Sequence, residues 1–348
     1  MKKYFVYIAL AILVISFSGC SLGVNKSSKE IGGIQLSTDS GNSWEVKNKA
    51  EEQKNISAVD VISVTIDPID SNKIYLGTKN KGIIISENNA ELWKKFNFPT
   101  KEDIYGIAIN YFNSQIMYAS GTLDDRGKIF KTNDGGENWE EIYTEPSSGT
   151  YITAMAMNNN DPHNIFVGTN KGVILKTSDG GISWNNLYSS NGAVAKIIFS
   201  EDENNNIYFL IYQKGVLMSD GDGNDFKKIK DEKTKLKLQG VFSIEADRNK
   251  SGTLYIGTDK GLFKSTNYDT FEEVDIVASS KKFPIRAIAV NPFNSKEIIY
   301  SVAQAMYRSV DGGENWSTTQ LDTTRVVSDI KFNMNNPNII LAGFRNFK

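Results

Sequence analysis

The sequence predicts an all-β protein, folded as a seven-bladed β-propeller with four antiparallel strands in each blade. Three observations carry this prediction: a repeated turn motif, a regular succession of short apolar runs, and half-units at the two ends that complement each other. A steady repeat of this kind indicates an array in which each unit is one supersecondary element. Short runs separated by turn residues indicate that this element is a small β-sheet.

The repeated motif reads Ser/Thr-x-Asp-x-Gly-x-x-Trp, and we name it the Asp-turn. Full copies lie at Ser37–Trp44, Thr132–Trp139, Thr177–Trp184 and Ser309–Trp316, and weaker copies lie at Ser86–Trp93, Ser219–Phe226 and Ser265–Phe271. The terminal aromatic residues follow one another at intervals of 42 to 49 residues. Copies at this spacing predict seven units of one kind.

Each unit holds the same succession of strands. The expected first strands are Val61–Asp67, Ile104–Asn110, Tyr151–Asn158, Val194–Ser200, Val241–Asp247, Ile285–Asn291 and Val326–Asn333. The expected second strands are Ile74–Thr78, Ile116–Gly121, Ile165–Thr169, Ile207–Tyr212, Leu254–Thr258, Ile298–Ala303 and Ile339–Phe344. A third strand leads into the Asp-turn, and the aromatic residue opens a fourth. Such units close into a propeller, which leaves few exposed strand edges.

The two ends of the chain are expected to complete one blade together. Residues 326–348 supply only the first two strands of a unit, and residues 31–48 supply only the last two. Pairing them removes the unpaired edge that an open array would leave at each end. We therefore expect a single propeller domain over residues 31–348.

The residues of the Asp-turn have structural reasons. An Asp side chain can accept hydrogen bonds from backbone N–H groups further along the turn, and Gly supplies a positive φ. The Trp is expected to pack under its own turn or against the next blade. The structural set is Asp39, Gly41, Trp44, Asp134, Gly136, Trp139, Asp179, Gly181, Trp184, Asp311, Gly313 and Trp316. Calcium is a second interpretation only at 220–225, where Asp225 stands at the position that a calcium loop gives to Gly, so no metal site is predicted.

This motif resembles the Asp-box, also called the bacterial neuraminidase repeat, and the resemblance covers essentially all of residues 31–348. The group that shares the repeat includes sialidases, xyloglucanases, the sortilin-type sorting-receptor domain and the photosystem II assembly-factor family. The resemblance implies the propeller fold. It implies no single chemistry, because these proteins share a fold and not an activity.

Residues 1–19 resemble a bacterial lipoprotein signal peptide. Two lysines precede the apolar run Tyr4–Phe17, which is shorter than the roughly 20 residues of a membrane-spanning helix. The sequence Phe-Ser-Gly-Cys that ends at Cys20 then resembles a lipobox, and an uncleaved N-terminal anchor is the alternative. Cys20 is the only cysteine, so its lipidation would leave no thiol for a disulfide or a nucleophile. We expect a lipid on Cys20, a tether over residues 20–30 and an extracytoplasmic location at the bacterial membrane.

Function is expected in the loops. In a propeller the connections from the second to the third strand and from the fourth to the next first strand share one side, which we name the loop face, and the Asp-turns lie on the opposite, Asp-turn face. A recurrent lysine stands in the second-to-third connections, at Lys81, Lys171, Lys214 and Lys260. It indicates either a basic ring that attracts an anionic partner or ordinary hairpin chemistry.

The candidate contact residues are Tyr105, Arg126, Tyr151, Arg286, Arg325 and Arg345. Tyr105, Tyr151, Arg286 and Arg325 stand where first strands begin, so they should approach the mouth of the channel on the loop face. Arg126 and Arg345 occupy places comparable to the recurrent lysines. The net charge of −2 gives no electrostatic support to nucleic-acid binding.

Enzymatic interpretations find little in the sequence. His163, the only histidine, lies in a polar turn with nothing that would complete a triad or a metal site. The run Phe283-Pro-Ile-Arg286 has the composition of a sialidase motif in the wrong order. A glycosidase needs two facing carboxylates, and many candidates exist, Asp60, Asp103, Asp124 and Asp125 among them.

The sequence therefore predicts a membrane-anchored, monomeric and non-catalytic scaffold without a cofactor. Its expected partner is a protein or a glycan of the cell envelope. The alternative is a glycoside hydrolase, sialidase-like or xyloglucanase-like, that acts on surface glycans.

Overall fold

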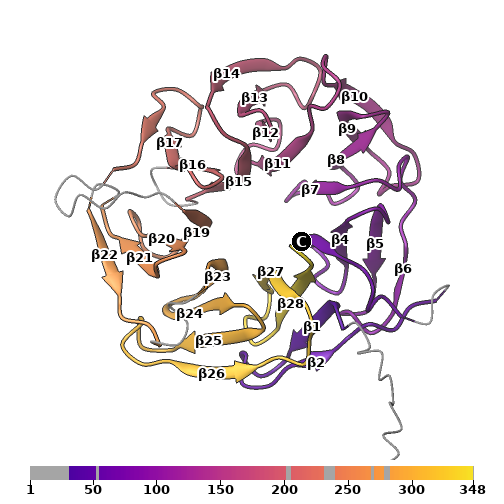
Figure 1. Cartoon of the computed structure of the whole chain (residues 1–348). Coiled ribbons are helices and arrows are strands. Elements are labelled where there is room, and N and C mark those ends of the chain that lie inside the picture. The colour runs from indigo at the N-terminus through magenta and orange to yellow at the C-terminus, as the bar shows by residue number, and fades with distance from the viewer. Residues whose placement is uncertain are drawn as a thin grey trace, which may run out of the picture.

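The structure is a computed structural model that describes residues 31–51, 55–200, 205–230, 240–267, 270–277 and 283–347. Seven four-stranded antiparallel sheets form a ring around a central channel, as the repeat predicts (Figure 1). Every regular element in these ranges is a strand. Nothing in them forms a helix long and apolar enough to cross a membrane. The leader, the tether and Cys20 fall outside the described residues.

Six blades are each built from four consecutive strands. Blades 1 to 3 are β3 Val61–Ile66, β4 Ile74–Thr78, β5 Ile83–Ser86 and β6 Trp93–Lys95; β7 Ile104–Ile109, β8 Met117–Leu123, β9 Arg126–Thr132 and β10 Glu140–Thr144; and β11 Ile152–Met157, β12 Ile165–Thr169, β13 Val173–Thr177 and β14 Asn185–Ser189. Blades 4 to 6 are β15 Val194–Phe199, β16 Ile207–Ile211, β17 Gly215–Ser219 and β18 Lys227–Lys228; β19 Val241–Ala246, β20 Leu254–Thr258, β21 Leu262–Ser265 and β22 Phe271–Val274; and β23 Ile285–Asn291, β24 Asn294–Val302, β25 Ala305–Ser309 and β26 Ser317–Gln320.

Blade 7 joins the two ends of the described chain. It consists of β27 Val326–Phe332, β28 Ile340–Arg345, β1 Gly33–Ser37 and β2 Glu45–Val46, in the order β2-β1-β28-β27. The register pairs Ile34 with Gly343 and Leu36 with Leu341. The predicted closure is confirmed, and the ring has no open end.

Strand limits differ from the predicted ones at several places. Six of the seven first strands end one residue before the predicted limit, because the polar residue there belongs to the following turn, as Asp67 does when its Oδ1 accepts from Ile69 N. The fourth strand of the blades with a full Asp-turn begins one residue after the Trp, at Glu45, Glu140, Asn185 and Ser317. The reason is that the turn closed by the Asp side chain extends to the residue before the Trp. Strand β24 begins at Asn294, earlier than predicted, because a two-residue turn at 292–293 lets the ladder run to the pair Asn291 and Asn294.

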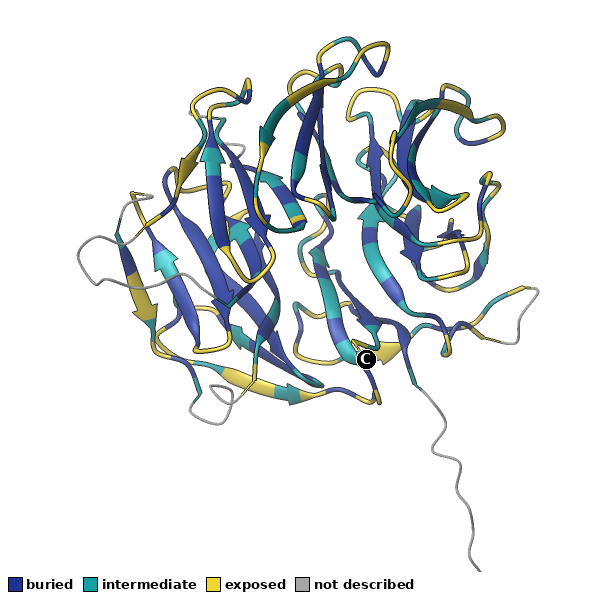
Figure 2. Ribbon diagram, turned by 45° about the horizontal axis from the view of Figure 1, so that its top comes forward, coloured by how far each residue is buried: buried dark blue, intermediate teal, exposed yellow. Residues whose placement is uncertain are grey.

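The core is divided among the blade interfaces. Seven hydrophobic clusters lie between neighbouring blades, and each draws residues from both of them. Second strands such as β4 and β12 are fully buried, whereas the outermost β2 and β18 are exposed (Figure 2). Such a core grows by repetition, which is how a ring exceeds the size of one conventional core.

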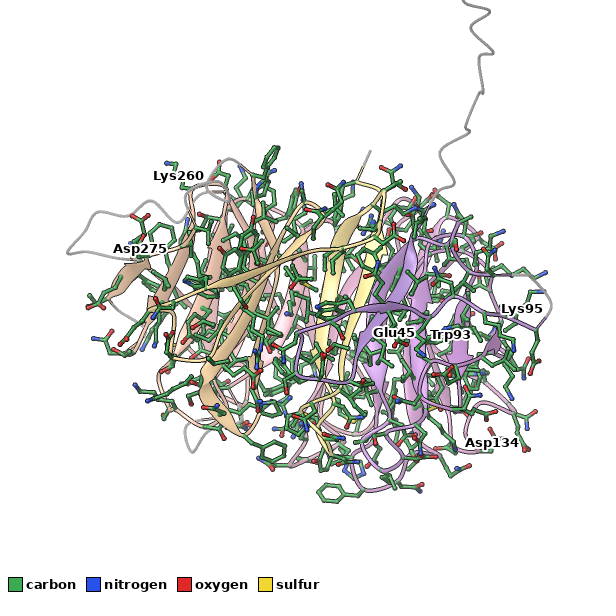
Figure 3. The ribbon with its side chains drawn as sticks, turned by 90° about the horizontal axis from the view of Figure 1, so that it is seen from below. Glu45, Trp93, Lys95, Asp134, Lys260 and Asp275 are labelled. Carbon is green, nitrogen blue, oxygen red and sulfur yellow. The ribbon has the colours of Figure 1, made fainter. Side chains whose placement is uncertain are left out.

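The Asp-turns form as predicted, and Trp316 packs against Gly313 of its own turn, but the indole N–H groups of three of the five tryptophans bond to a blade that was not expected. Asp179 accepts hydrogen bonds from Ser183 N and Thr177 Oγ1, at 2.9 and 2.7 Å. Trp93 Nε1 donates to Lys47 O at 2.7 Å, and Trp139 and Trp316 make equivalent bonds. These acceptors follow the fourth strand of the preceding blade, not the next one, because that strand ends beside the indole. Figure 3 shows Trp93 beside Glu45 of blade 7.

Candidate binding site at the channel mouth

The two faces of the ring lie as expected. Lys260, in a second-to-third connection, is on one side of the molecule, and Asp134, in an Asp-turn, is on the other (Figure 3). Lys81, Lys171, Lys214 and Lys260 are all exposed on the loop face. Their turns show hairpin geometry, with positive φ at Asn80, Gly82, Gly172 and Gln213. Ordinary hairpin chemistry therefore explains where these lysines stand, and their charge remains on the surface.

A ring of seven residues, one from each blade, lines the upper mouth of the channel on the loop face. It consists of Ile62, Tyr105, Thr153, Ala195, Phe242, Arg286 and Ser328. Each is the extra residue of a β-bulge near the start of a first strand. A bulge turns a side chain out of the regular alternation. We name this set the bulge ring, and the space that it surrounds has a volume of about 260 Å³.

The local sequence explains the bulge ring. The residue before each member is a fully buried Ile or Val, such as Ile104 before Tyr105 and Ile285 before Arg286. This residue anchors the strand in the blade interface, so the bulged residue after it faces the channel. Side chains of the innermost strands also join neighbouring blades, as when Thr153 Oγ1 donates to Val194 O at 2.7 Å. The bulge ring therefore presents seven side chains at the mouth, one from each blade, on strands that hydrogen bonds join from blade to blade.

Arg286 belongs to a row of alternating rings and cations. Its guanidinium carbon lies 4.9 Å from the ring centre of Phe242 and 4.2 Å from that of Phe347. The guanidinium carbon of Arg345 lies 5.2 Å from the same Phe347 ring. We name these four residues the arginine–aromatic row. Each such contact is worth about 0.5–1 kcal/mol at an exposed site.

The two arginines of this row have no carboxylate partner among the described residues. Their guanidinium groups make no hydrogen bond or ion pair there, and Arg345 Nε is buried without an acceptor. The rings contact the two guanidinium groups, whose N–H groups, the buried Arg345 Nε included, are left without a partner among the described residues. A planar, preorganised pair of this kind matches a carboxylate or a phosphate.

Two of the candidate tyrosines form pairs with aspartates. Tyr105 Oη donates to Asp103 Oδ2 at 3.2 Å, and burial together with that carboxylate raises the pKa of Tyr105 to about 12. Tyr151 Oη donates to Asp125, whose carboxylate raises the pKa of Tyr151. Both phenols therefore stay protonated at neutral pH. A sialidase-type nucleophile requires the opposite, an activated tyrosine.

Arg325 differs from the other candidate residues. It is only 7% exposed, its Nη1 lies 2.6 Å from Asp60 Oδ1, and its Nη2 donates to Ala58 O at 3.0 Å. Asn346 N also donates to Asp60 Oδ1. Arg325 and Asp60 thus brace the junction between blades 7 and 1 and contribute little to the open mouth.

Charged side chains also lie inside the channel. Lys196 Nζ is 3.1 Å from Glu245 Oε2 and donates to Ile244 O at 3.0 Å. Burial opposes the charge on Lys196, yet Glu245 and Asp329 hold its pKa above the ordinary value. Lys331 Nζ stands 3.8 Å from Asp329. The two channel carboxylates are thus already engaged by lysines.

The structure brings together only some of the residues expected at the mouth. Tyr105 and Arg286 lie in the bulge ring, and Arg345 adjoins it. Tyr151 is bonded to the neighbouring hairpin, where Arg126 begins β9. Sequence reasoning missed Phe242, Phe347 and Lys196. The signal for Phe242 was its place after the Val that begins a first strand, since every member of the bulge ring follows an Ile or a Val that begins its first strand or stands second in it.

Comparisons with known proteins agree with the architecture. The family model described as Sortilin, neurotensin receptor 3 matches residues 32–167. Xyloglucanase Xgh74A of Acetivibrio thermocellus is 25% identical over 328 residues, which cover 82% of this chain and 35% of that protein. A probable oligoxyloglucan-reducing end-specific xyloglucanase of Neosartorya fischeri is 31% identical over 88 residues, 24% of this chain and 11% of that protein. The chain spans about a third or less of these curated relatives.

Solved structures show the same fold. The GH74 xyloglucanase of Xanthomonas campestris has a TM-score of 0.68 at 16% identity, covering 83% of this chain and 52% of that one. YCF48 of Cyanidioschyzon merolae has a TM-score of 0.64 at 16% identity, covering 82% and 96%. YCF48 bound to D1 peptide has a TM-score of 0.62 at 15% identity, covering 83% and 93%. The resemblance to sortilin-type and photosystem II assembly-factor propellers is thereby confirmed, at the level of the fold.

Proposed function

We propose that this protein is a non-catalytic binding scaffold whose upper mouth takes an anionic group of a protein partner. The observation that carries the proposal is the arginine–aromatic row, in which Arg286 and Arg345 are held in place without a carboxylate partner among the described residues. A carboxylate that docks there would form charge-assisted hydrogen bonds with donors that are already oriented. The exposed lysines of the loop face would steer it toward the mouth.

A protein partner is favoured over a glycan by the relatives of matching size. The chain covers 93% of the YCF48 chain that was solved with a D1 peptide, but only 52% of the GH74 xyloglucanase from Xanthomonas campestris. In size, this chain is therefore closer to the single propeller that was solved with a peptide than to the xyloglucanase. A glycan ligand is the other outcome that the experiment below distinguishes.

We further propose that the scaffold acts at the membrane, through a lipid on Cys20. Ile31, where the described chain begins, lies on the loop face, because Ile31 N donates to Thr324 Oγ1 at 3.1 Å and Thr324 N donates back to Ile31 O at 3.0 Å. A tether of about ten residues reaches at most roughly 35 Å. The mouth would then face the membrane, and its partner would be a segment exposed at the membrane surface.

Binding of an acidic peptide tests this proposal. The probes are a peptide of consecutive glutamates and its glutamine counterpart, titrated against the full chain by calorimetry. We expect the acidic peptide to bind, and Arg286→Ala to weaken it about tenfold, as the loss of a charge-assisted pair implies. Arg126→Ala is the matched control, since it removes a loop-face cation outside the row. Equal binding of both peptides, or an equal loss in the control, would refute the proposal.

A glycoside hydrolase is the second candidate, favoured by one observation. Glu245 lines the lower part of the channel and Asp329 the upper part, and the chain is 25% identical to a xyloglucanase over 82% of its length. Their engagement with Lys196 and Lys331 opposes a general-acid role, which requires a protonated carboxyl group. Incubation with xyloglucan and sialyllactose should release no sugar. Turnover that Glu245→Gln abolishes would establish the hydrolase instead.

A further inference from the structure

The Asp-turn face carries a recess that the proposed function does not use. It has a volume of about 270 Å³ and is lined by Tyr111, Phe112, Asn158, Asn159, Asn160, Phe199 and Asn205. It adjoins the lower end of the channel, a space of about 290 Å³, with which it shares Tyr111, Asn159 and Phe199. Among the described residues, the recess lining contains aromatic rings and side-chain amides and no charged residue.

One wall of the recess is an aromatic platform in the turn between β7 and β8. Phe112 is 68% exposed and Tyr111 is 41% exposed, and their ring centres lie 6.1 Å apart at 78°. The turn is held by Asn110, whose Oδ1 accepts a hydrogen bond from Phe112 N at 2.9 Å. A phenyl ring with this exposure contributes little to folding, yet its position is fixed by its turn.

The other wall is the asparagine turn between β11 and β12. Asn158 Oδ1 accepts a hydrogen bond from Asn160 N at 2.9 Å, which fixes this turn as well. Within the described residues, Asn158 Nδ2 and the side-chain amide of Asn160 make no hydrogen bond. Each primary amide can both donate and accept, so the wall offers paired donors and acceptors.

We propose that this recess binds a neutral sugar. The C–H face of a pyranose ring can lie on Phe112, while its hydroxyl groups exchange hydrogen bonds with Asn158 and Asn160. Apolar walls with a few placed polar groups are the usual composition of a small-molecule site. A charged ligand would meet no counter-charge among the described lining residues, and a purely apolar ligand would leave the amides unpaired.

The location supports a site that works independently of the upper mouth. Ile31 lies on the loop face, opposite the recess, so a lipid anchor of the kind proposed above would attach on the other side of the ring. Neither such an anchor nor a ligand at the upper mouth would cover the described lining of the recess. The two binding events can be tested separately on one protein.

Calorimetry of the full chain with neutral tetrasaccharides tests the proposal. The panel is cellotetraose, maltotetraose, mannotetraose and chitotetraose, with sialyllactose as the anionic comparison. We expect at least one neutral sugar to bind, and Phe112→Ala to weaken its binding about tenfold, the scale of one buried stacking contact. Phe293→Ala is the matched control. Phe293 is 64% exposed on the same face, and its N–H donates to Asn291 Oδ1 at 2.8 Å, as that of Phe112 does to Asn110.

Three results would overturn the site. The first is no binding by any neutral sugar up to about 10 mM, the weak end of the affinity scale. The second is wild-type affinity in Phe112→Ala, or an equal loss in Phe293→Ala. The third is loss of sugar binding in Arg286→Ala, which would place the sugar at the upper mouth. Unchanged sugar binding in Arg286→Ala supports the recess even if the acidic-peptide proposal fails.

Discussion

The carboxylate of Asp329 in β27 accepts a hydrogen bond from the backbone N–H of Val64 in β3, at 3.1 Å from Oδ2. Its other oxygen accepts from Ile330 N at 3.1 Å. Blade 7, which contains strands from both ends of the described chain, is thereby fixed to blade 1 at the channel wall. Ser328 Oγ adds a second bond, to Val61 O at 2.7 Å.

Replacing Asp329 should loosen this junction. Asp329→Ala leaves the N–H of buried Val64 without its acceptor, which costs about 1–3 kcal/mol of the free energy of unfolding. Urea unfolding measures the change. Asp322→Ala is the control, because Asp322 is exposed in the loop that precedes β27 and should change stability by less than about 0.5 kcal/mol. Equal midpoints for the two variants would contradict the role given to Asp329.

The arginines should separate into structural and binding residues. Arg325→Ala leaves Asp60 without its buried partner and should cost about 3–5 kcal/mol. Arg286→Ala removes two ring contacts and should cost about 1 kcal/mol. Chemical denaturation of both variants checks that Arg325→Ala loses more stability than Arg286→Ala. A larger loss of stability in Arg286→Ala would mean that the row supports the fold instead of a ligand.

The Asp-turns should make the propeller sensitive to acid. Hydrogen bonds from Ser43 lower the pKa of Asp39 to about 2, and those from Asn138 do the same for Asp134. Similar bonds lower the pKa of Asp179 and Asp311 further. In the unfolded chain these carboxylates titrate near their ordinary value of 3.8. As the pH falls, the unfolded state therefore takes up protons at a higher pH than the folded state does. The stability that Asp39 and Asp134 contribute is complete when the pH is above the ordinary value of 3.8, and it is lost as the pH falls toward 2.

Replacing the four aspartates by asparagine should flatten the dependence of the melting temperature on pH below about 4. Blade 1 shows that asparagine can form the turn, since Asn88 Oδ1 accepts from Leu92 N at 2.9 Å. Melting curves of both proteins between about pH 2 and 7 provide the measurement. Parallel curves would show that the Asp-turns do not carry the acid sensitivity.

Replacing Gly136, which packs against Phe96, should cost more stability than replacing Gly312, where an added Cβ has no neighbour within 4 Å. Gly136 has a φ of 96°, and a Cβ placed on it would lie 2.2 Å from the ring of Phe96. Gly312 has a φ of 88° and nothing within 4 Å of such a Cβ. Both substitutions by alanine strain the backbone by about 1 kcal/mol, and Gly136→Ala should cost about 1–3 kcal/mol more because it crowds the blade interface. Equal losses in thermal or urea unfolding would contradict this account.

Most of the fold was predictable because one pattern recurs. The Asp-turn fixes where the third strand of each blade ends, and β4, β12, β20 and β23 have the limits expected from their apolar runs. The direction in which the tryptophans reach could not be derived. It depends on how neighbouring blades are inclined, and the sequence of a single unit does not carry that information.

The site was less predictable because a bulge breaks the alternation of side chains. Tyr105 and Arg286 each follow a buried residue, Ile104 or Ile285, and face the channel. Arg325 stands two residues before the corresponding buried residue, Val327, and turns into the blade junction. Phe347 lies beyond the last expected strand, so its place between two arginines follows from tertiary structure alone.

A crystal structure of the protein with the glutamate peptide tests the central claim most directly. The account predicts a carboxylate at the loop-face mouth, about 2.7–2.9 Å from a guanidinium nitrogen of Arg286 or Arg345. A peptide seated on the Asp-turn face, or a mouth whose arginines stay unpaired while the peptide binds elsewhere, would contradict it.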